Sequence, residues 1–225
     1  MNHPYLKDEH DIFRKSLRKF LGKEAYPFYD QWEEERLIPR AFWTKMGDQG
    51  FLCPDLAETY GGYEVDWGYS VVINEELERV GSGLVGIGLH NDIVVPYINS
   101  FGTEEQKQRF LPKCVTGEYI TAIAMTEPGA GSDLANIATT AVLQGDHYIL
   151  NGAKTFITNG IYADYYIVAA KTNPELGNKG ISIFLMDTGL KGISAVKLDK
   201  LGWRASDTAE IAFDNVEIPA ANLMG

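Results

Sequence analysis

A glycine-rich stretch in the middle of the chain has the composition of a ligand-binding loop. Residues 124–134 read AMTEPGAGSDL, in which two glycines precede Ser132 and Asp133. Gly129 and Gly131 permit positive φ and carry no Cβ, so backbone N–H groups could converge here on an acceptor. This arrangement suits a flavin ring edge or a phosphate, and an ordinary multiple-turn loop is the alternative. The stretch has neither P-loop nor G-x-G-x-x-G spacing.

A second stretch, residues 151–160, reads NGAKTFITNG and places an aromatic side chain near a hydroxyl. In a β-strand, residues two positions apart lie on the same face. Phe156 would then cover an aromatic cofactor, while the hydroxyl of Thr158 donates to one of its heteroatoms. The alternative is a hairpin strand whose phenylalanine belongs to the core.

Other residues that commonly perform chemistry show no comparable pattern. Metal-ligand spacing is absent among the four histidines, which are His3, His10, His90 and His147. His90 could lie near a ligand, or it could be a structural histidine whose hydrogen bonds are satisfied. The carboxylates at 33–35 are expected to form a solvated helix face. No G-x-S-x-G nucleophile elbow is present.

Composition narrows the functional class. Of 225 residues, 45% are hydrophobic and 23% charged, as in soluble globular proteins. The formal charge of −11 argues against a nucleic-acid surface. Cys53 and Cys114 lie outside any C-x-x-C pattern and are predicted to be reduced structural thiols. Because we see neither a membrane-spanning run nor a targeting segment, we expect a cytoplasmic protein.

The first half of the chain reads as helices, because apolar residues recur three and four positions apart. One apolar face of the first helix is predicted to consist of Ile12, Phe13, Leu17, Phe20 and Leu21. Further helices are predicted at 39–50, 69–80, 84–101 and from Thr103 to Pro112. In the helix at 69–80, the carboxylates expected to face largely outward are Glu75, Glu76 and Glu78.

After Gly117 the pattern changes to short β-type runs separated by turn residues. Strands are predicted at 120–125, 138–143, 148–150, 155–158, 165–170, 181–186, 193–198 and 209–213. A Gly145-Asp146 turn joins the second and third of them into a hairpin. Such a series predicts a β-barrel or sandwich. We therefore place an all-α domain at 1–118 and a β domain at 119–225, with no closing element expected after Pro219.

Taken together, these stretches resemble the acyl-CoA dehydrogenase family. In the second half the resemblance rests on AMTEPGAGSDL, YILNGAKTFITNGIYADYYIVAAKT, GISIFLMD and LGWRASDTAEIAFDNVEIPAANLMG. In the first half it rests on EHDIFRKSLRKFLGKEAYP, YGGYEVDWGYSVVINEELERVG and LHNDIVVPYINSFGTEEQKQRFLPK, of which the last two are similar to the long-chain branch. The resemblance implies an N-terminal helical domain and a middle β domain, without the family's C-terminal four-helix bundle. Since that bundle carries the catalytic glutamate, no catalytic residue is assigned in this chain.

The resemblance also implies an activity. It implies FAD-dependent α,β-dehydrogenation of acyl-CoA thioesters of medium to long chain, which gives trans-2-enoyl-CoA. The electrons would pass to an electron-transfer flavoprotein, and the protein would be a homotetramer when the C-terminal domain is present. One alternative is an acyl-CoA oxidase, in which oxygen is the acceptor. Another is an inert assembly or acyl-CoA-binding module, if 225 residues is the natural length.

Site residues follow from the resemblance position by position. The cofactor-binding residues that it implies are Ile123, Ala124, Met125, Thr126, Glu127, Pro128, Gly129, Ala130, Gly131, Ser132, Phe156, Ile157 and Thr158. Thr158 would donate to flavin N5, and Phe156 stands where many members have Trp. Ser132, Asn178 and Lys179 correspond to positions that touch the CoA moiety.

The stretch SGLVGIGLHND at 82–92 falls where the family's acyl pocket ends. Val85 and Leu89 are expected to form apolar walls of that pocket. Gly86 and Gly88 are unfavourable in a helix by about 1 kcal/mol each relative to Ala. They would either leave space for a long acyl tail or permit close helix–helix packing.

Overall fold

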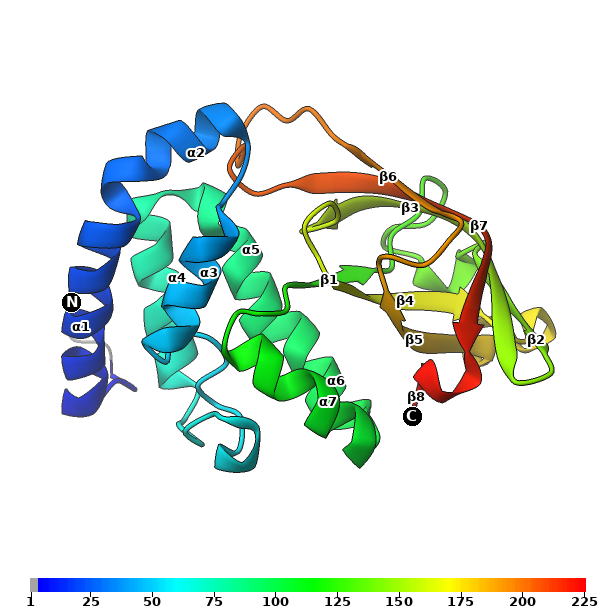
Figure 1. Ribbon diagram of the computed structural model, residues 1–225, viewed down its shortest axis with the longest axis horizontal. Helices are drawn as coiled ribbons and strands as arrows, with labels where there is room; N and C mark the ends of the chain where they lie inside the picture. The colour runs from blue at the N-terminus through cyan, green and yellow to red at the C-terminus, as the bar shows by residue number, and fades with distance from the viewer. Residues whose placement is uncertain (1–3) are drawn as a thin grey trace. The chain divides into compact units, whose positions relative to one another are not determined.

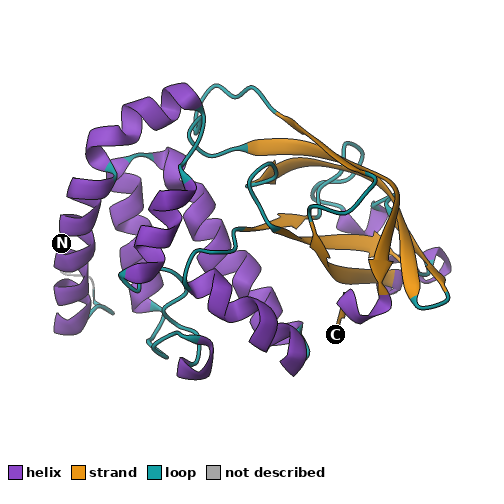
Figure 2. Ribbon diagram, viewed as in Figure 1, coloured by secondary structure: helices purple, strands orange, loops and turns teal. Residues whose placement is uncertain are grey.

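The computed structural model describes residues 4–225, so His3 lies outside the described residues. It divides into two compact units. The helical unit holds residues up to 100, residues 104–119 and residues 199–206, and the β unit holds 101–103, 120–198 and 207–225. The predicted succession of an all-α domain and a β domain is confirmed (Figure 2).

Seven α-helices lie in the first half of the described chain (Figure 1). They are α1 (Asp8–Glu24), α2 (Tyr29–Glu35), α3 (Arg40–Asp48), α4 (Gly68–Val80), α5 (Val85–Leu89), α6 (Val95–Phe101) and α7 (Glu104–Val115). The single helix predicted at 84–101 is interrupted, because a π-helical turn at His90–Val94 separates α5 from α6. Pro112 lies inside α7, which continues to Val115, so the prediction that Pro112 ends this helix is wrong.

The packing of α1 against α4 corrects two further predictions. Leu17 and Leu21 are buried as expected, but Ile12 is 68% exposed and does not belong to the apolar face. Glu76 is buried rather than outward-facing, and its carboxylate accepts from Arg14 Nη1 at 2.9 Å and Arg18 Nε at 2.7 Å. Burial by itself would raise the pKa of Glu76, but the hydrogen bonds from Arg18 and Arg14 lower it overall. The carboxylate therefore remains ionised and joins the two helices.

The segment 199–206 folds onto the helical unit through a carboxylate on α2. Glu33 accepts from the backbone N–H of Arg204 at 3.2 Å and of Ala205 at 2.9 Å. The hydroxyl of Tyr29 donates to Glu33 at 2.9 Å and accepts from the N–H of Gly83 at 2.8 Å. Glu33 is thus half-buried and structural, and the solvated face predicted for 33–35 is wrong at this position.

The β unit is one mixed eight-stranded sheet in the order β6-β7-β3-β2-β4-β5-β8, with β1 paired to β4. Its strands are β1 (Thr121–Ala124), β2 (Thr140–Gln144), β3 (His147–Thr158), β4 (Tyr165–Lys171), β5 (Ile181–Asp187), β6 (Ile193–Lys197), β7 (Thr208–Pro219) and β8 (Leu223–Met224). The turn at 145–146 joins β2 to β3 as predicted. The strand expected at 155–158 is the end of β3, and β8 provides a closing strand that was not expected.

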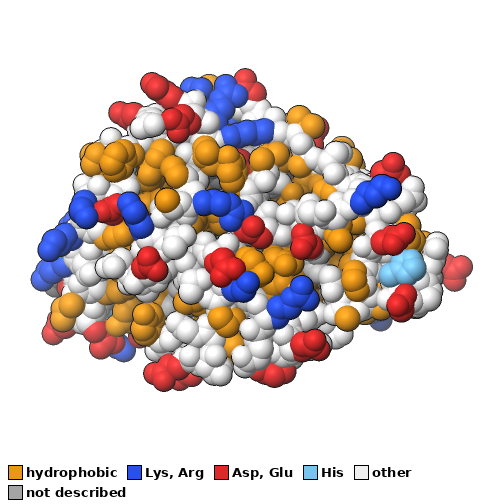
Figure 3. Space-filling view, viewed as in Figure 1, with side chains coloured by type: hydrophobic (Ala, Val, Ile, Leu, Met, Phe, Trp, Pro, Cys, Tyr) orange, Lys and Arg blue, Asp and Glu red, His pale blue; other side chains and the backbone are white. Residues whose placement is uncertain are grey.

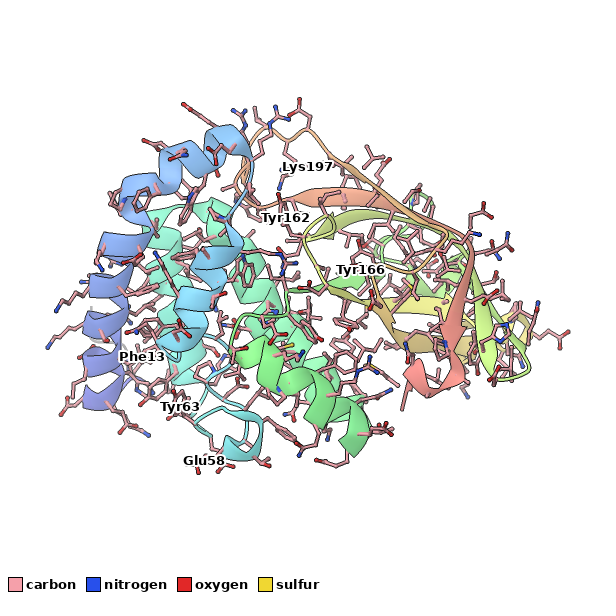
Figure 4. All side chains as sticks on the ribbon, viewed as in Figure 1. Phe13, Glu58, Tyr63, Tyr162, Tyr166 and Lys197 are labelled. Atoms are coloured by element: carbon pink, nitrogen blue, oxygen red, sulfur yellow. The ribbon has the colours of Figure 1, made fainter. Side chains whose placement is uncertain are left out.

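The main core of the β unit lies on one face of this sheet, and a smaller buried cluster of Ala130, Ile137 and Ala169 lies on the other. On β7, Ala209, Ile211 and Phe213 alternate inward, and the alternation resumes one position later at Val216. The change of phase coincides with Asn215, whose φ is +50°. Tyr166 of β4 is buried among the strands and donates its hydroxyl to the carbonyl oxygen of Gly160 (Figure 4).

Charged side chains of both signs are interspersed on the face drawn in Figure 3, with no gathered basic patch. This agrees with the acidic net charge of the sequence. Over residues 4–225, no helix combines the length and the apolar character that crossing a bilayer requires.

Candidate functional site

The two motifs singled out in the sequence are hydrogen-bonded to each other within the β unit. The loop at 125–139 follows β1, and the N–H of Thr155 on β3 donates to the carbonyl oxygen of Thr126 at 2.9 Å. The loop then turns tightly, because the N–H groups of Glu127 and Ala130 each donate to the other residue's carbonyl, at 2.9 and 3.1 Å. The loop therefore has a defined conformation fixed to the end of β3.

A buried ion pair supports the loop from beneath. Lys154 of β3 is 1% exposed and donates Nζ to Oε1 of Glu127 at 2.8 Å and to the carbonyl of Met125 at 3.0 Å. Glu127 also accepts from the N–H groups of Ala138 at 2.5 Å and Thr139 at 3.0 Å. Burial lowers the pKa of Lys154, while the hydrogen bond from Lys154 helps to keep that of Glu127 below its usual value. The carboxylate and the N–H of Glu127 are both engaged within the loop, and its predicted cofactor contact stays a prediction.

The glycines of the loop leave an open surface. Neither Gly129 nor Gly131 has a positive φ, so neither uses the left-handed backbone that glycine permits. A Cβ built on either would meet no other atom of the described residues within 4 Å. The fold of the unit itself therefore does not require glycine here. A ligand can approach the backbone closely only where no side chain intervenes, so these two glycines are suited to ligand binding.

Phe156 lies on a β-bulge at the end of β3. The β3–β7 register shifts between Lys154 and Ile157, and Phe156 has a φ of +59°. Its side chain is 69% exposed, so the alternative that it belongs to the core is wrong. A bulky residue held at positive φ is a strained conformation that clusters at functional sites. Ile157 next to it is buried in the core, and Thr158 is half-buried.

The predicted cofactor-binding residues thus differ in what they present. Exposed side chains or glycines are found at Pro128, Gly129, Gly131, Ser132 and Phe156. Half-buried positions are Ile123, Met125, Thr126 and Thr158. Buried positions, which could offer only backbone groups, are Ala124, Glu127, Ala130 and Ile157.

The residues predicted to contact CoA, which are Ser132, Asn178 and Lys179, lie on neighbouring segments of the β unit. Asn178 and Lys179 are exposed on a 3-10 segment, η6 (Pro174–Gly180). This segment contacts η5 (Leu134–Asn136), the turn that follows shortly after Ser132. The β unit therefore gathers these three residues on neighbouring turns.

The predicted acyl-pocket residues belong to the helical unit. Val85 and Leu89 are half-buried at the two ends of α5, and Gly88 between them is buried. A Cβ on Gly88 would collide with Oδ1 of Asn74, whose amide donates to Asp92 Oδ2 at 2.6 Å. Close packing against α4 therefore explains Gly88, and the expected space for an acyl tail is not found at this position.

Two of the histidines, His90 and His10, are engaged in hydrogen bonds within the helical unit. His90 is buried, its Nε2 lies 3.2 Å from the carbonyl of Cys114, and burial lowers its pKa to about 4. His10 accepts from the N–H of Lys7 at 2.8 Å through Nδ1, so Nε2 carries the proton and donates to Asp66 at 2.8 Å. Neither nitrogen of His10 has a free lone pair for a metal, although Glu9 lies near.

Comparison with known proteins identifies the family. Residues 7–118 match the model of the acyl-CoA dehydrogenase N-terminal domain, and residues 122–216 match that of the middle domain. The chain belongs to the acyl-CoA dehydrogenase family. Within this family, the chain is 47% identical over 220 residues to the mitochondrial long-chain specific acyl-CoA dehydrogenase of Rattus norvegicus. That match covers 96% of this chain and 51% of the relative, so the chain spans about half the relative's length.

Solved acyl-CoA dehydrogenase structures share this fold closely. An acyl-CoA dehydrogenase from Geobacillus kaustophilus superimposes with a TM-score of 0.97 at 63% identity, covering 99% of this chain and 59% of that one. A glutaryl-CoA dehydrogenase from Mycobacterium smegmatis, in complex with FADH2, gives a TM-score of 0.90 at 32% identity. It covers 97% of this chain and 55% of that chain.

Proposed function

We propose that the protein to which this chain belongs dehydrogenates acyl-CoA thioesters between the α and β carbons, with FAD as cofactor. The observation that carries the proposal is the open glycine loop hydrogen-bonded to a strand that presents Phe156 at positive φ. Family membership supports the same reaction, whose product would be a trans-2-enoyl-CoA.

The residues present fit a flavin. A flat ring needs a surface without side chains, and Gly129 and Gly131 offer one. Phe156 would cover the ring, and the hydroxyl of Thr158 and the backbone of Thr126 would donate to its polar edge. FAD when bound supplies the hydride acceptor, and the surrounding residues orient it.

Substrate contacts are proposed for five residues. The amide of Asn178, the ammonium of Lys179 and the hydroxyl of Ser132 are suited to the polar CoA moiety, whose phosphates attract a cation. Val85 and Leu89 supply apolar surface for the acyl chain. A preference for medium to long chains is supported by the resemblance to the long-chain specific rat enzyme. Electron transfer to a flavoprotein, homotetrameric assembly and a cytoplasmic location stay predictions.

The test uses the full-length protein, assayed with butyryl-, octanoyl- and palmitoyl-CoA. We expect a yellow protein that releases FAD on heating, and faster anaerobic flavin bleaching with octanoyl- and palmitoyl-CoA than with butyryl-CoA. Rapid reoxidation by air without a flavoprotein acceptor would favour the oxidase alternative. Residues 1–225 alone serve as a control and should hold FAD weakly without turnover. A full-length protein that binds acyl-CoA but contains no FAD would overturn the proposal.

A further inference from the structure

Lys154 is a buried cation whose position is fixed by the loop of the candidate site. Its side chain is fully buried, and Nζ donates both to the carbonyl of Met125 and to Glu127, at 3.0 and 2.8 Å. The partner carboxylate is itself held by two further backbone donors. The ammonium therefore stays in contact with the Met125 carbonyl rather than moving to solvent.

The carbonyl that Lys154 contacts belongs to the same peptide group as the N–H of Thr126. No peptide between residues 4 and 225 is cis, so this C=O and this N–H point in opposite directions. Among the described residues, the N–H of Thr126 has no hydrogen-bond partner. It is therefore a donor directed away from Lys154, on a half-buried residue of the open loop.

We propose that Lys154 polarises the Met125–Thr126 peptide and thereby strengthens the Thr126 N–H as a donor to the polar edge of the flavin. Hydrogen bonds in a chain reinforce one another, and a bond from an ionised donor is stronger than a neutral one. Reduction adds negative charge to the polar edge of a flavin, so a stronger donor there favours the reduced cofactor. Lys154 is thus a positioning and tuning residue that acts through the loop, and this role rests on the proposed function.

A purely structural role for the Lys154–Glu127 pair makes a different prediction. If the pair only held the loop in shape, loss of either partner would disturb the flavin in the same way. If the ammonium polarises the peptide, Glu127→Gln should preserve the effect as long as Lys154 stays protonated and bonded to Met125. Because Glu127 is the group that raises the pKa of the buried Lys154, the variants are compared at acidic pH. Replacing both members, as in Lys154→Met/Glu127→Gln, removes the charge without leaving an unpaired buried ion, and such double replacements are often tolerated.

The experiment measures the FAD midpoint potential of the full-length protein. For the double variant we expect the affinity for reduced FAD, relative to that for oxidised FAD, to fall about tenfold. For a two-electron couple this lowers the midpoint potential by about 30 mV. Glu127→Gln should show no such fall. The exposed Lys191→Met removes one positive charge elsewhere in the β unit and serves as the matched control, with an unchanged potential. If the first double variant does not fold, Lys154→Gln/Glu127→Gln serves the same test.

A second measurement does not need the cofactor. In the FAD-free full-length protein, the carbonyl 13C resonance of Met125 should move upfield in the double variant and keep its position in Glu127→Gln. An unchanged potential in the double variant with FAD bound, or an equal fall in both variants, would overturn the inference. A wild-type protein without FAD would overturn the proposed function instead, and the two failures are thereby distinguished.

Discussion

The N–H of Thr155 donates to the carbonyl oxygen of Thr126 at 2.9 Å, and this bond joins two segments nearly thirty positions apart in the sequence. One segment carries the open glycines, and the other carries the bulge with Phe156. Because Lys154 also reaches the carbonyl of Met125, loop and strand are fixed together at adjacent positions. Substitutions on one segment should therefore affect cofactor binding by the other.

Replacing Thr158 by Val in the full-length protein tests the proposed donor to flavin N5. Valine keeps the β-branched shape at a position that pairs with Thr208 in the sheet. A lost hydrogen bond is worth about 0.5–3 kcal/mol, so flavin reduction should slow by roughly threefold to a hundredfold. Stopped-flow reduction by substrate measures this rate. A rate equal to wild type with FAD fully bound would exclude the contact.

Gly131→Ala tests whether the open loop surface belongs to a ligand. Because φ is not positive and no atom of the described residues lies within 4 Å of the new Cβ, stability should stay the same or rise by up to about 1 kcal/mol. FAD affinity in the full-length protein should fall at least about tenfold. Gly152→Ala is the contrasting control, since its Cβ would meet Thr139 Cα at 2.7 Å and it should lower the Tm. An FAD affinity of Gly131→Ala equal to that of the wild-type protein would contradict the proposal that the flavin approaches the loop at Gly131.

Gly88→Ala tests the packing explanation on α5. The new methyl group would overlap the side chain of Asn74, and overpacking of this kind destabilises by about 1–3 kcal/mol. Asn74→Ala removes the overlap, so Gly88→Ala should lower the free energy of unfolding much less in the Asn74→Ala background than in the wild-type protein. Denaturant unfolding of all four proteins gives the coupling. Additive losses would mean that Gly88 does not pack against Asn74.

His90 should make stability depend on pH below neutrality. Its folded pKa of about 4 lies below the ordinary value of about 6.5, because burial disfavours the charged ring. As pH falls from 6.5 to 4, the unfolded chain binds a proton that the folded chain excludes, so the free energy of unfolding decreases by up to about 3 kcal/mol. His90→Gln should flatten this slope in urea titrations. Equal slopes in wild type and His90→Gln would contradict the assignment.

Local periodicity predicted the helices well, because an apolar stripe at helical spacing needs no distant partner. Leu17, Leu21, Val72 and Ile73 are buried as that spacing indicates. The failures are carboxylates whose partners lie far away along the chain. Glu76 meets arginines about sixty positions away, and Glu33 meets backbone N–H groups more than 170 positions away. No local pattern distinguishes such carboxylates from solvated ones.

In the candidate site, sequence reasoning found the segments but not their internal structure. The bulge at Phe156 depends on pairing with β7, and an alternating pattern cannot show that one residue is extra. Lys154 was missed because a lysine in a strand is normally exposed, and only the fold places it against Glu127. The sole local signal was its place between Ala153 and Thr155 in an otherwise uncharged strand end.

The segment at 199–206 has a consequence for how the chain acquires its structure during synthesis. The helical unit is discontinuous, since these residues leave the ribosome long after α7 yet supply two N–H groups that donate to Glu33. Domains generally fold as units from the N-terminus during translation, but here the first unit must wait until most of the second has been made. Until then Glu33 keeps the Tyr29 hydroxyl as a donor but lacks the N–H groups of Arg204 and Ala205, so a nascent chain halted near residue 120 should be a better chaperone client and protease substrate than one halted after 206.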